Sequence, residues 1–202
     1  MQFSGRADCD LKAQNLNDSL CSLLSKNIKG LIIDLRLNGG GAMYPMILGV
    51  QQLLQHGQIG SFQSRKNEKW YLSKTDFKFD TTTLASITPK CDIKGQNMPV
   101  VMLISPPTGS SAEFFIIAFK GRTKTVLLGS KTAGYITGVE GYPINDAAYI
   151  LLSTSYGVDR YGNIYKKAIE PDIPFTSIDS FNDIPNDVKV KEAVKWLKLN
   201  IK

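Results

Sequence analysis

Two short apolar runs, each ending in a turn that leads into a helical pattern, constrain the fold of this chain more than any other feature. One run covers residues 31–35 and leads into three consecutive glycines at 39–41, and the other covers 99–104 and leads into a turn that ends at Ser110. Apolar runs of this length are typical of strands that are buried on both faces. Repeated strand–turn–helix units predict an α/β fold with a mainly parallel core sheet.

The remaining periodicity predicts elements on both sides of these units. Helical spacing indicates helices over 11–24, 44–54 and 110–119 and a final helix after Asn186, whereas further strands are expected at 125–128 and 149–154 and a turn at 157–163. Asp8 or Asp10 would cap the first helix and Asn186 the last, because short polar side chains accept hydrogen bonds from free N–H groups at helix starts.

Residues 57–98 break the alternation of strands and helices. Apolar and aromatic residues flank a polar stretch at 65–69, which predicts a hairpin, and a further short strand is expected near Phe77. We interpret this stretch as a hairpin-rich insertion in a single domain that covers residues 1–202. It is equally compatible with a lid over a site and with a peripheral decoration.

Composition and charge exclude several function classes. The formal net charge is +6, but the lysines are scattered and are not interleaved with aromatic residues, so no nucleic-acid partner is expected. No segment is long and apolar enough to cross a bilayer, and no signal peptide is recognised. Neither a P-loop nor a GxGxxG fingerprint is present, so we expect no nucleotide cofactor.

The three cysteines, Cys9, Cys21 and Cys91, show no CxxC spacing and no neighbouring histidine, so a metal site is not expected. Cys9 and Cys21 would pair only if the fold brought them together, and one cysteine would be left over. We therefore expect buried free thiols, which leaves the redox compartment undetermined.

The turn at residues 108–113, TGSSAE, holds the residues best suited to nucleophilic chemistry. A serine at a strand-to-helix turn presents its hydroxyl at the sheet edge, where free helix N–H groups stabilise a developing oxyanion. Taken alone, the stretch is better explained as a capping box formed by Ser110 and Glu113. The glycines at 39–41 would form half of an oxyanion hole, an anion-binding nest or only a tight turn.

Four segments in order resemble the S41 family of serine peptidases, which includes C-terminal-processing and tricorn-like enzymes. They are GLIIDLRLNGGG at 30–41, PVVMLISPPTGSSAE at 99–113, LLGSKTAGY at 127–135 and AIEPDIPF at 168–175. The resemblance therefore spans residues 30–175. Ala168 departs from the family pattern, in which glycine is common at that position.

This resemblance implies a ClpP/crotonase-like spiral of ββα units and a peptidase that acts on peptide or protein substrates. It assigns the nucleophile to Ser110, the oxyanion-hole N–H groups to Ser111 and to Gly40 or Gly41, and a supporting role to Glu113. Tyr135 would line the cleft, as aromatic side chains do for peptide side chains, or would only pack, and Thr132 is the other candidate substrate contact. By the family resemblance the protein is expected to lie outside the cytoplasm. We expect no PDZ domain within residues 1–202, and the oligomeric state stays open.

The general base is the point where the sequence departs from the family. Many members use a lysine directly after the glycine of the Gly-x-x-Thr-x-Gly loop, but Tyr135 occupies that position and Lys131 does not match it. Nisin-resistance-like and tricorn-like branches use an upstream histidine instead. The only histidine here, His56, follows the glycine loop at the end of a predicted helix, where a surface role is expected.

We therefore expect the base to be a histidine outside this chain, with the N-terminal region of the full family architecture missing. The alternative is a non-catalytic, peptide-binding member of the same fold. A crotonase-type acyl-CoA enzyme is disfavoured by the TGSSAE and Pro-Asp motifs.

Overall fold

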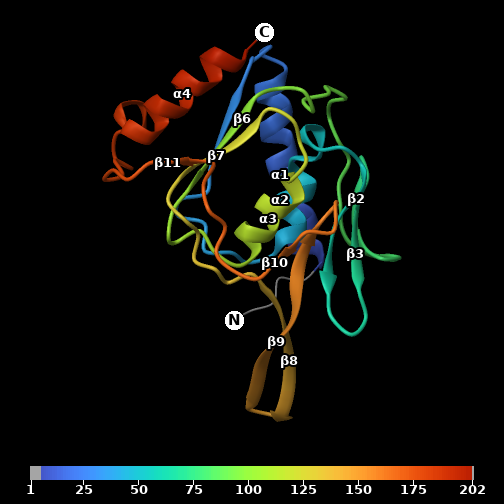
Figure 1. The fold of residues 1–202 in the computed structure, drawn as a ribbon. Helices are drawn as coiled ribbons and strands as arrows, with labels where there is room; N and C mark the ends of the chain where they lie inside the picture. The colour runs from blue at the N-terminus through green and yellow to red at the C-terminus, as the bar shows by residue number, and fades with distance from the viewer. Residues whose placement is uncertain (1–5, 202) are drawn as a thin grey trace.

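The computed structural model describes residues 6–201 and contains two sheets with helices packed between and around them (Figure 1). The first sheet is parallel, with the order β1-β6-β7-β11. Its strands are β1 (Leu31–Asp34), β6 (Val100–Ile104), β7 (Thr125–Gly129) and β11 (Ile173–Pro174). The prediction of an α/β fold with a parallel core sheet is confirmed.

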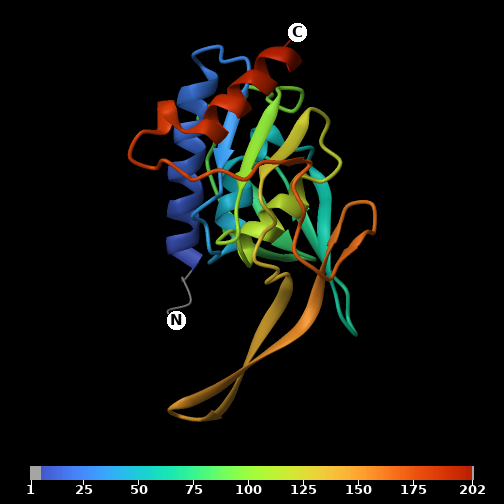
Figure 2. The same ribbon diagram turned by 60° about the vertical axis from the view of Figure 1, so that its left-hand side comes forward.

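The central strand β6 is buried at all five positions, as the continuous apolar run predicts. Val101 and Leu103 pack toward α4 (Val188–Asn200) on one face of the sheet, whereas Met102 and Ile104 pack into the main core on the other face. The main core also holds α1 (Arg6–Leu24), α2 (Met43–Gly49) and α3 (Ser111–Phe119), and Figure 2 shows α4 on the opposite side of this sheet.

The second sheet is antiparallel and contains the stretch that the sequence marks as an insertion. Its meander consists of β2 (Gly57–Gln63), β3 (Glu68–Leu72), β4 (Asp76–Phe79) and β5 (Thr82–Ser86). Trp70 and Phe77 of this meander are fully buried in the main core, beside α2 and α3 residues. The meander therefore forms part of the core. It is neither a lid over a site nor a peripheral decoration.

The second sheet continues through β9 (Ala148–Asp159), which pairs with β2, with β8 (Thr137–Asn145) and with β10 (Ile164–Tyr165). The expected strand at 149–154 thus exists, but it is antiparallel. The expected turn at 157–163 is shorter, because β9 runs on to Asp159. The outer parts of β8 and β9 form a two-stranded ribbon that projects from the body of the molecule (Figures 1 and 2).

Helix ends differ from the sequence expectation in three places. Asp8 and Asp10 lie inside α1 and do not cap it. The cap of α4 is Asp187, whose carboxylate accepts a hydrogen bond from the N–H of Val190, whereas Asn186 belongs to the short 3-10 helix η2 (Ile184–Asn186). The predicted helix at 44–54 is split into α2 and the 3-10 helix η1 (Gln51–Leu53).

Cys21 and Cys91 form a disulfide that ties α1 to the segment after β5, so the expectation of free thiols is wrong for these two residues. The two cysteines are 70 positions apart, and the tertiary contact that joins them leaves no local pattern. Cys9 is buried and outside the disulfide, as expected. None of the helices within residues 6–201 has the length and apolarity needed to cross a membrane.

Candidate active site

Three loops meet at the edge where β1, β6 and β7 end. They are residues 35–41 after β1, residues 105–110 after β6, and residues 130–136 after β7. The carboxyl ends of parallel strands lie at the same edge of a sheet, and ligand sites of α/β folds form outside that edge. The sequence expectation placed all its site residues in these loops or at the start of α3.

Hydrogen bonds tie the three loops into one unit. The N–H of Gly109 donates to the carbonyl of Asn38 at 3.1 Å, and the N–H of Ala133 donates to the carbonyl of Thr108 at 2.8 Å. The hydroxyl of Thr108 donates to the carbonyl of Leu35 at 2.8 Å. The loop at residues 105–110 is therefore hydrogen-bonded to both the loop after β1 and the loop after β7.

Ser110 has a backbone conformation that side-chain-bearing residues rarely adopt, with φ 54° and ψ −121°. Such a conformation costs roughly 1–3 kcal/mol and persists only where the surroundings impose it. Here the N–H of Ser110 donates to the carboxylate of Glu113 at 2.9 Å, and its carbonyl accepts from the N–H of Glu113 at 2.8 Å. The strained turn places a half-buried serine at the start of α3.

Glu113 connects this turn to the loop after β7. Its side chain is fully buried and accepts hydrogen bonds from the Thr132 hydroxyl at 2.5 Å and from the N–H of Gly134 at 2.8 Å. Thr132 is itself buried, and its hydroxyl oxygen also accepts from the N–H of Ile169 at 2.8 Å. Thr132 thus positions the loop, and its burial does not support the expected contact with substrate.

The glycine loop packs directly against the serine turn. A Cβ on Gly40, which has φ +113°, would lie 2.8 Å from the Cβ of Ser110 and 3.1 Å from the nitrogen of Ser111, so only glycine fits. The hydroxyl of Ser111 donates to the carbonyl of Gly41 at 2.6 Å. This contact satisfies the hydroxyl of the buried Ser111.

The two expected oxyanion-hole glycines are not equivalent. The N–H of Gly40 donates to the side-chain oxygen of Asn38 at 3.0 Å, so this donor is already used. Within residues 6–201 no hydrogen bond occupies the N–H of Gly41 or that of Ser111. Of the two alternatives, Gly41 therefore has the donor that is free to bind an oxyanion.

Arg36 fixes the segment that leads into the glycine loop (residues 39–41) through buried ion pairs. Its guanidinium is fully buried and forms ion pairs with Asp34, Asp179 and Asp187 at 2.6, 2.7 and 2.8 Å. Burial opposes the charge, but the hydrogen bonds that the guanidinium donates to the three carboxylates raise the pKa of Arg36. The partly exposed Asp34 thus pairs with the buried Arg36. The two distant aspartates were missed, because nothing in the local sequence marks them.

Burial alone would raise the pKa of Asp187, but hydrogen bonds from the N–H of Ser180 and from Arg36 lower it to about 2. This carboxylate is therefore ionised at neutral pH and balances part of the Arg36 charge.

An open hollow of about 490 Å³ lies beside the glycine loop. It is lined by Asp34, Leu37, Asn38, Gly39, Gly40 and Phe181. On the other side of the serine turn, Tyr135 is 70% exposed and its ring lies 3.2 Å from where a Cβ of Gly109 would stand. The serine turn thus has a polar hollow on one side and an exposed aromatic side chain on the other.

Neither basic side chain considered for proton transfer is built into this unit. The Nε2 atom of His56 lies 2.8 Å from the side-chain oxygen of Gln51. Both residues line a separate cavity that includes Asp92 and none of the loop residues described above. Lys131 lies in the loop after β7 but is exposed. Across residues 6–201, no cluster of histidine, cysteine and acidic side chains could hold a metal ion.

The sequence profile of Peptidase family S41 matches residues 2–175, which include all three loops. The chain is 30% identical over 204 residues to a nisin-resistance protein of Lactococcus lactis subsp. lactis, a match that covers 100% of this chain and 59% of that relative. It is 26% identical over 198 residues to the carboxy-terminal processing protease CtpA of Bacillus subtilis, covering 92% of this chain and 39% of the relative.

Among solved structures, a lipoprotein from Streptococcus agalactiae superposes with a TM-score of 0.73 at 26% identity, covering 98% of this chain and 63% of that one. The chain thus spans less than two thirds of the length of these relatives.

Proposed function

The chain belongs to peptidase family S41, and we propose that it supplies the nucleophile and the oxyanion hole of a serine peptidase that hydrolyses peptide bonds through an acyl-enzyme on Ser110. The observation that carries the proposal is the backbone of Ser110, which is strained at φ 54° and fixed by the buried Glu113 carboxylate. A simple helix cap needs no such conformation, whereas a nucleophile that must project from a sharp strand-to-helix turn does.

The proposed reaction uses the groups around that turn in sequence. The Ser110 oxygen attacks the carbonyl carbon of a peptide bond while its proton passes to a base. The carbonyl oxygen, now an oxyanion, accepts hydrogen bonds from the N–H groups of Ser111 and Gly41. Collapse breaks the C–N bond, the departing amine takes the proton, and water then hydrolyses the ester.

The base is proposed to be a histidine outside this chain. His56 is the only histidine in the sequence, and it lines a cavity that shares no residue with the loops around Ser110. A serine without a base is a weak nucleophile. The chain by itself is therefore proposed to react slowly, and a form of the protein that carries an upstream histidine is proposed to react fast.

Labelling with a fluorescent fluorophosphonate tests this proposal. A longer form that includes an upstream histidine should label at Ser110, and Ser110→Ala should abolish the label. Ser64→Ala, a change in the exposed turn between β2 and β3, is the matched control and should label normally. If the longer form fails to label while it remains folded, the catalytic proposal is wrong.

A second candidate function is peptide binding without turnover, which the position of His56 favours. This reading predicts that the protein binds extended peptides and that Ser110→Ala binds them with unchanged affinity and without any cleavage by either form. Release of product by wild type, analysed by mass spectrometry, would exclude it.

Substrate and location are part of the same proposal. Peptide or protein substrates are proposed from family membership, with Tyr135 as a contact because its ring is exposed beside the serine turn.

A location outside the cytoplasm is supported by the Cys21–Cys91 disulfide, since disulfides persist in oxidising compartments. Alkylation of the unfolded protein before and after reduction tests this: the protein isolated from its source should expose only the Cys9 thiol before reduction.

A further inference from the structure

A small, largely enclosed cavity of about 20 Å³ lies beyond the C-terminal end of α3, the opposite end of this helix from Ser110. Arg122, from the loop after α3, and Arg160, from the turn after β9, both line it. Much of the remaining wall consists of three amide side chains, those of Gln55, Gln96 and Asn97. None of the described residues that line the cavity is acidic. A space of this size holds one water molecule or one ion of similar size.

The guanidinium of Arg122 is hydrogen-bonded but has no counter-charge. Its Nε donates to the carbonyl of Leu53 at 2.8 Å. Its terminal nitrogens donate only to neutral oxygens, namely the carbonyls of Gly95, Met98, Thr123 and Lys124 and the hydroxyl of Thr125. Across residues 6–201 Arg122 forms no ion pair. Burial lowers its pKa to about 10, so this unbalanced charge persists at neutral pH.

Arg160 adds a second positive charge and a free donor. Its terminal nitrogens donate to the carbonyl of Ala118 at 3.3 Å and to the side-chain oxygen of Gln55 at 3.4 Å, both long hydrogen bonds. Its Nε is buried and has no hydrogen-bond partner among the described residues. A buried donor is costly to leave unpaired, so this nitrogen indicates that the cavity holds an acceptor.

The acidic groups nearest along the chain or in the adjoining hollow are engaged elsewhere. Asp159 precedes Arg160 and raises its pKa, but its carboxylate accepts four hydrogen bonds from its own turn and from Tyr165. Asp92, in the adjoining hollow, pairs with Lys74 at 2.9 Å. The loop at 120–124, KGRTK, carries three positive charges and no negative one. Water would satisfy the free donor but would leave these charges unbalanced, whereas an anion does both.

We propose that this cavity binds a single monoatomic anion, chloride in ordinary salt solutions, which accepts a hydrogen bond from the Nε–H of Arg160 and balances the charges of the two guanidinium groups. Chloride is only slightly larger than water, whereas sulfate and phosphate are too large for the enclosed space. The amide of Asn97 lines the same space and supplies a further N–H donor. The bound anion stabilises the fold by joining the loop after α3 to the turn after β9, so the proposal does not depend on catalysis at Ser110.

Urea unfolding at constant ionic strength tests this site. Sodium chloride replaces sodium gluconate stepwise, so the general screening of charges stays the same while chloride rises, and gluconate is too large to enter the cavity. At a chloride concentration about ten times the dissociation constant, the ratio of folded to unfolded protein should be about tenfold higher than in gluconate. Bromide, which is similar in size and charge, should act as chloride does.

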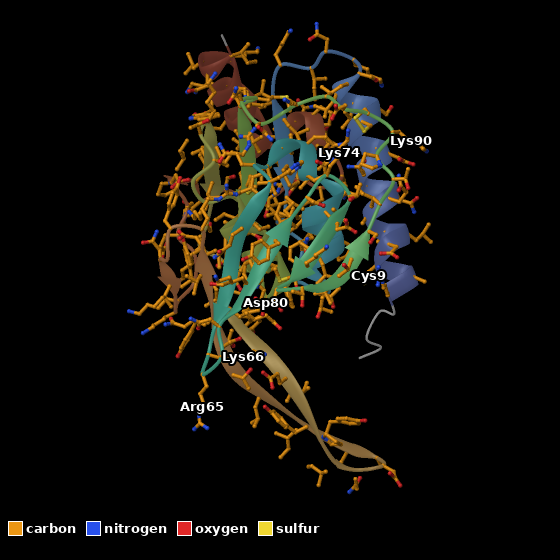
Figure 3. The ribbon with its side chains drawn as sticks, turned by 90° about the vertical axis from the view of Figure 1, so that its right-hand side faces the viewer. Cys9, Arg65, Lys66, Lys74, Asp80 and Lys90 are labelled. Carbon is orange, nitrogen blue, oxygen red and sulfur yellow. A yellow bond between two sulfur atoms is a disulfide. The ribbon has the colours of Figure 1, made fainter. Side chains whose placement is uncertain are left out.

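A pair of arginine variants locates the effect. Arg160→Gln removes the free donor and one charge, and it should abolish the dependence on chloride. Arg65→Gln is the matched control, because it removes the same charge from an exposed arginine that projects from the turn between β2 and β3 (Figure 3). Gln55 precedes β2 and Arg65 follows it, so the seven residues of this strand place the control about 20 Å away. Arg65→Gln should keep the chloride dependence of wild type.

Anomalous scattering from wild-type crystals soaked in sodium bromide locates the ion without any variant. A bromide peak within hydrogen-bond distance of the Arg160 Nε is expected. A cavity that holds only water in these crystals would overturn the proposal, as would an Arg160→Gln protein that folds and depends on chloride as strongly as wild type. Equal urea midpoints of wild type in chloride and gluconate would also overturn it, even with a bromide peak, since the peak would then report binding at crystal concentration only.

Discussion

The serine turn (residues 108–113) and the arm, the projecting ribbon that the outer parts of β8 and β9 form (residues 137–156), are stabilised in opposite ways. In the turn, a strained residue is fixed by a buried carboxylate that accepts three hydrogen bonds from Ser110, Thr132 and Gly134. In the arm, apolar side chains of both faces are exposed, and beyond the pairing of Tyr156 with β2 its two strands pair only with each other. The contrast shows that the hydrogen bonds that fix the backbone are gathered at the turn that carries Ser110, whereas the arm keeps its apolar side chains exposed.

Removing one carboxylate from each region should give the largest difference. Glu113→Ala leaves three donors without an acceptor, the buried Thr132 hydroxyl and the partly buried N–H groups of Ser110 and Gly134, at about 1–3 kcal/mol each, so we expect the free energy of unfolding to fall by about 3–5 kcal/mol. Labelling of Ser110 should fall with it, because the strained turn loses its support. Chemical denaturation and fluorophosphonate labelling measure the two effects.

Glu140→Ala is the matched change in the arm. This carboxylate also accepts two hydrogen bonds, from Tyr142 and Thr154, but it is exposed. Exposed substitutions usually change stability by less than about 0.5 kcal/mol. Equal losses in the two variants would show that the turn is no better determined than the arm.

A glycine pair sharpens the same contrast at a smaller scale. Gly40→Ala puts a Cβ 2.8 Å from the Cβ of Ser110 at φ +113°, so we expect a loss of about 2–3 kcal/mol and slower labelling of Ser110. In the arm, Gly141→Ala meets Leu151 at 3.4 Å and Tyr149 at 4.0 Å, both ordinary contacts, and should be nearly neutral. Gly57→Ala measures the strain of a positive φ without a clash, because Gly57 has φ +107° and no atom lies within 4 Å of the added Cβ. A Gly40→Ala protein no less stable than Gly57→Ala would rule out the clash.

Much of the serine turn was predictable because its information is local. The apolar runs at 31–35 and 99–104 predict buried strands, and the structure has β1 and β6 there. The expected helix start at Ser110 is also found, and the glycines at 39–41 form the turn that packs against it. Strand periodicity, turn residues and helix signals all act within a few residues, so sequence reasoning finds them.

The arm and the supports of the site were not predictable in the same way. The 149–154 segment was expected in a parallel core, because an apolar run does not tell a buried strand from an exposed arm. The pairing of Arg36 with Asp179, 143 positions away, and the Cys21–Cys91 disulfide arise only from tertiary contacts. Local patterns therefore gave the loop that carries Ser110, but not what holds the glycine loop in place.

Acid should destabilise the Arg36 ion-pair cluster next to the glycine loop by protonating the buried carboxylate of Asp187. The two carboxylates of the arm, in contrast, are exposed. Asp187 has its pKa lowered to about 2 by hydrogen bonds from the Ser180 N–H and Arg36, which outweigh the opposing effect of burial. Its pKa in the unfolded chain lies near 3.8. The unfolded state therefore binds more protons in this range. Stability should be fully present above about pH 5 and decline as the pH falls through 4 toward 2, by about 2 kcal/mol for this one group.

Urea unfolding of wild type and of Asp187→Asn between pH 2 and 6 measures this contribution. The variant should be less stable near pH 6, because it leaves part of the buried Arg36 charge unbalanced. It should also lose less stability on acidification than wild type. Asp146→Asn, which removes an exposed carboxylate of the arm, is the matched control. If Asp187→Asn keeps the same slope as Asp146→Asn, the Arg36 cluster is no more sensitive to acid than the arm, and the contrast between the two regions does not extend to their charged groups.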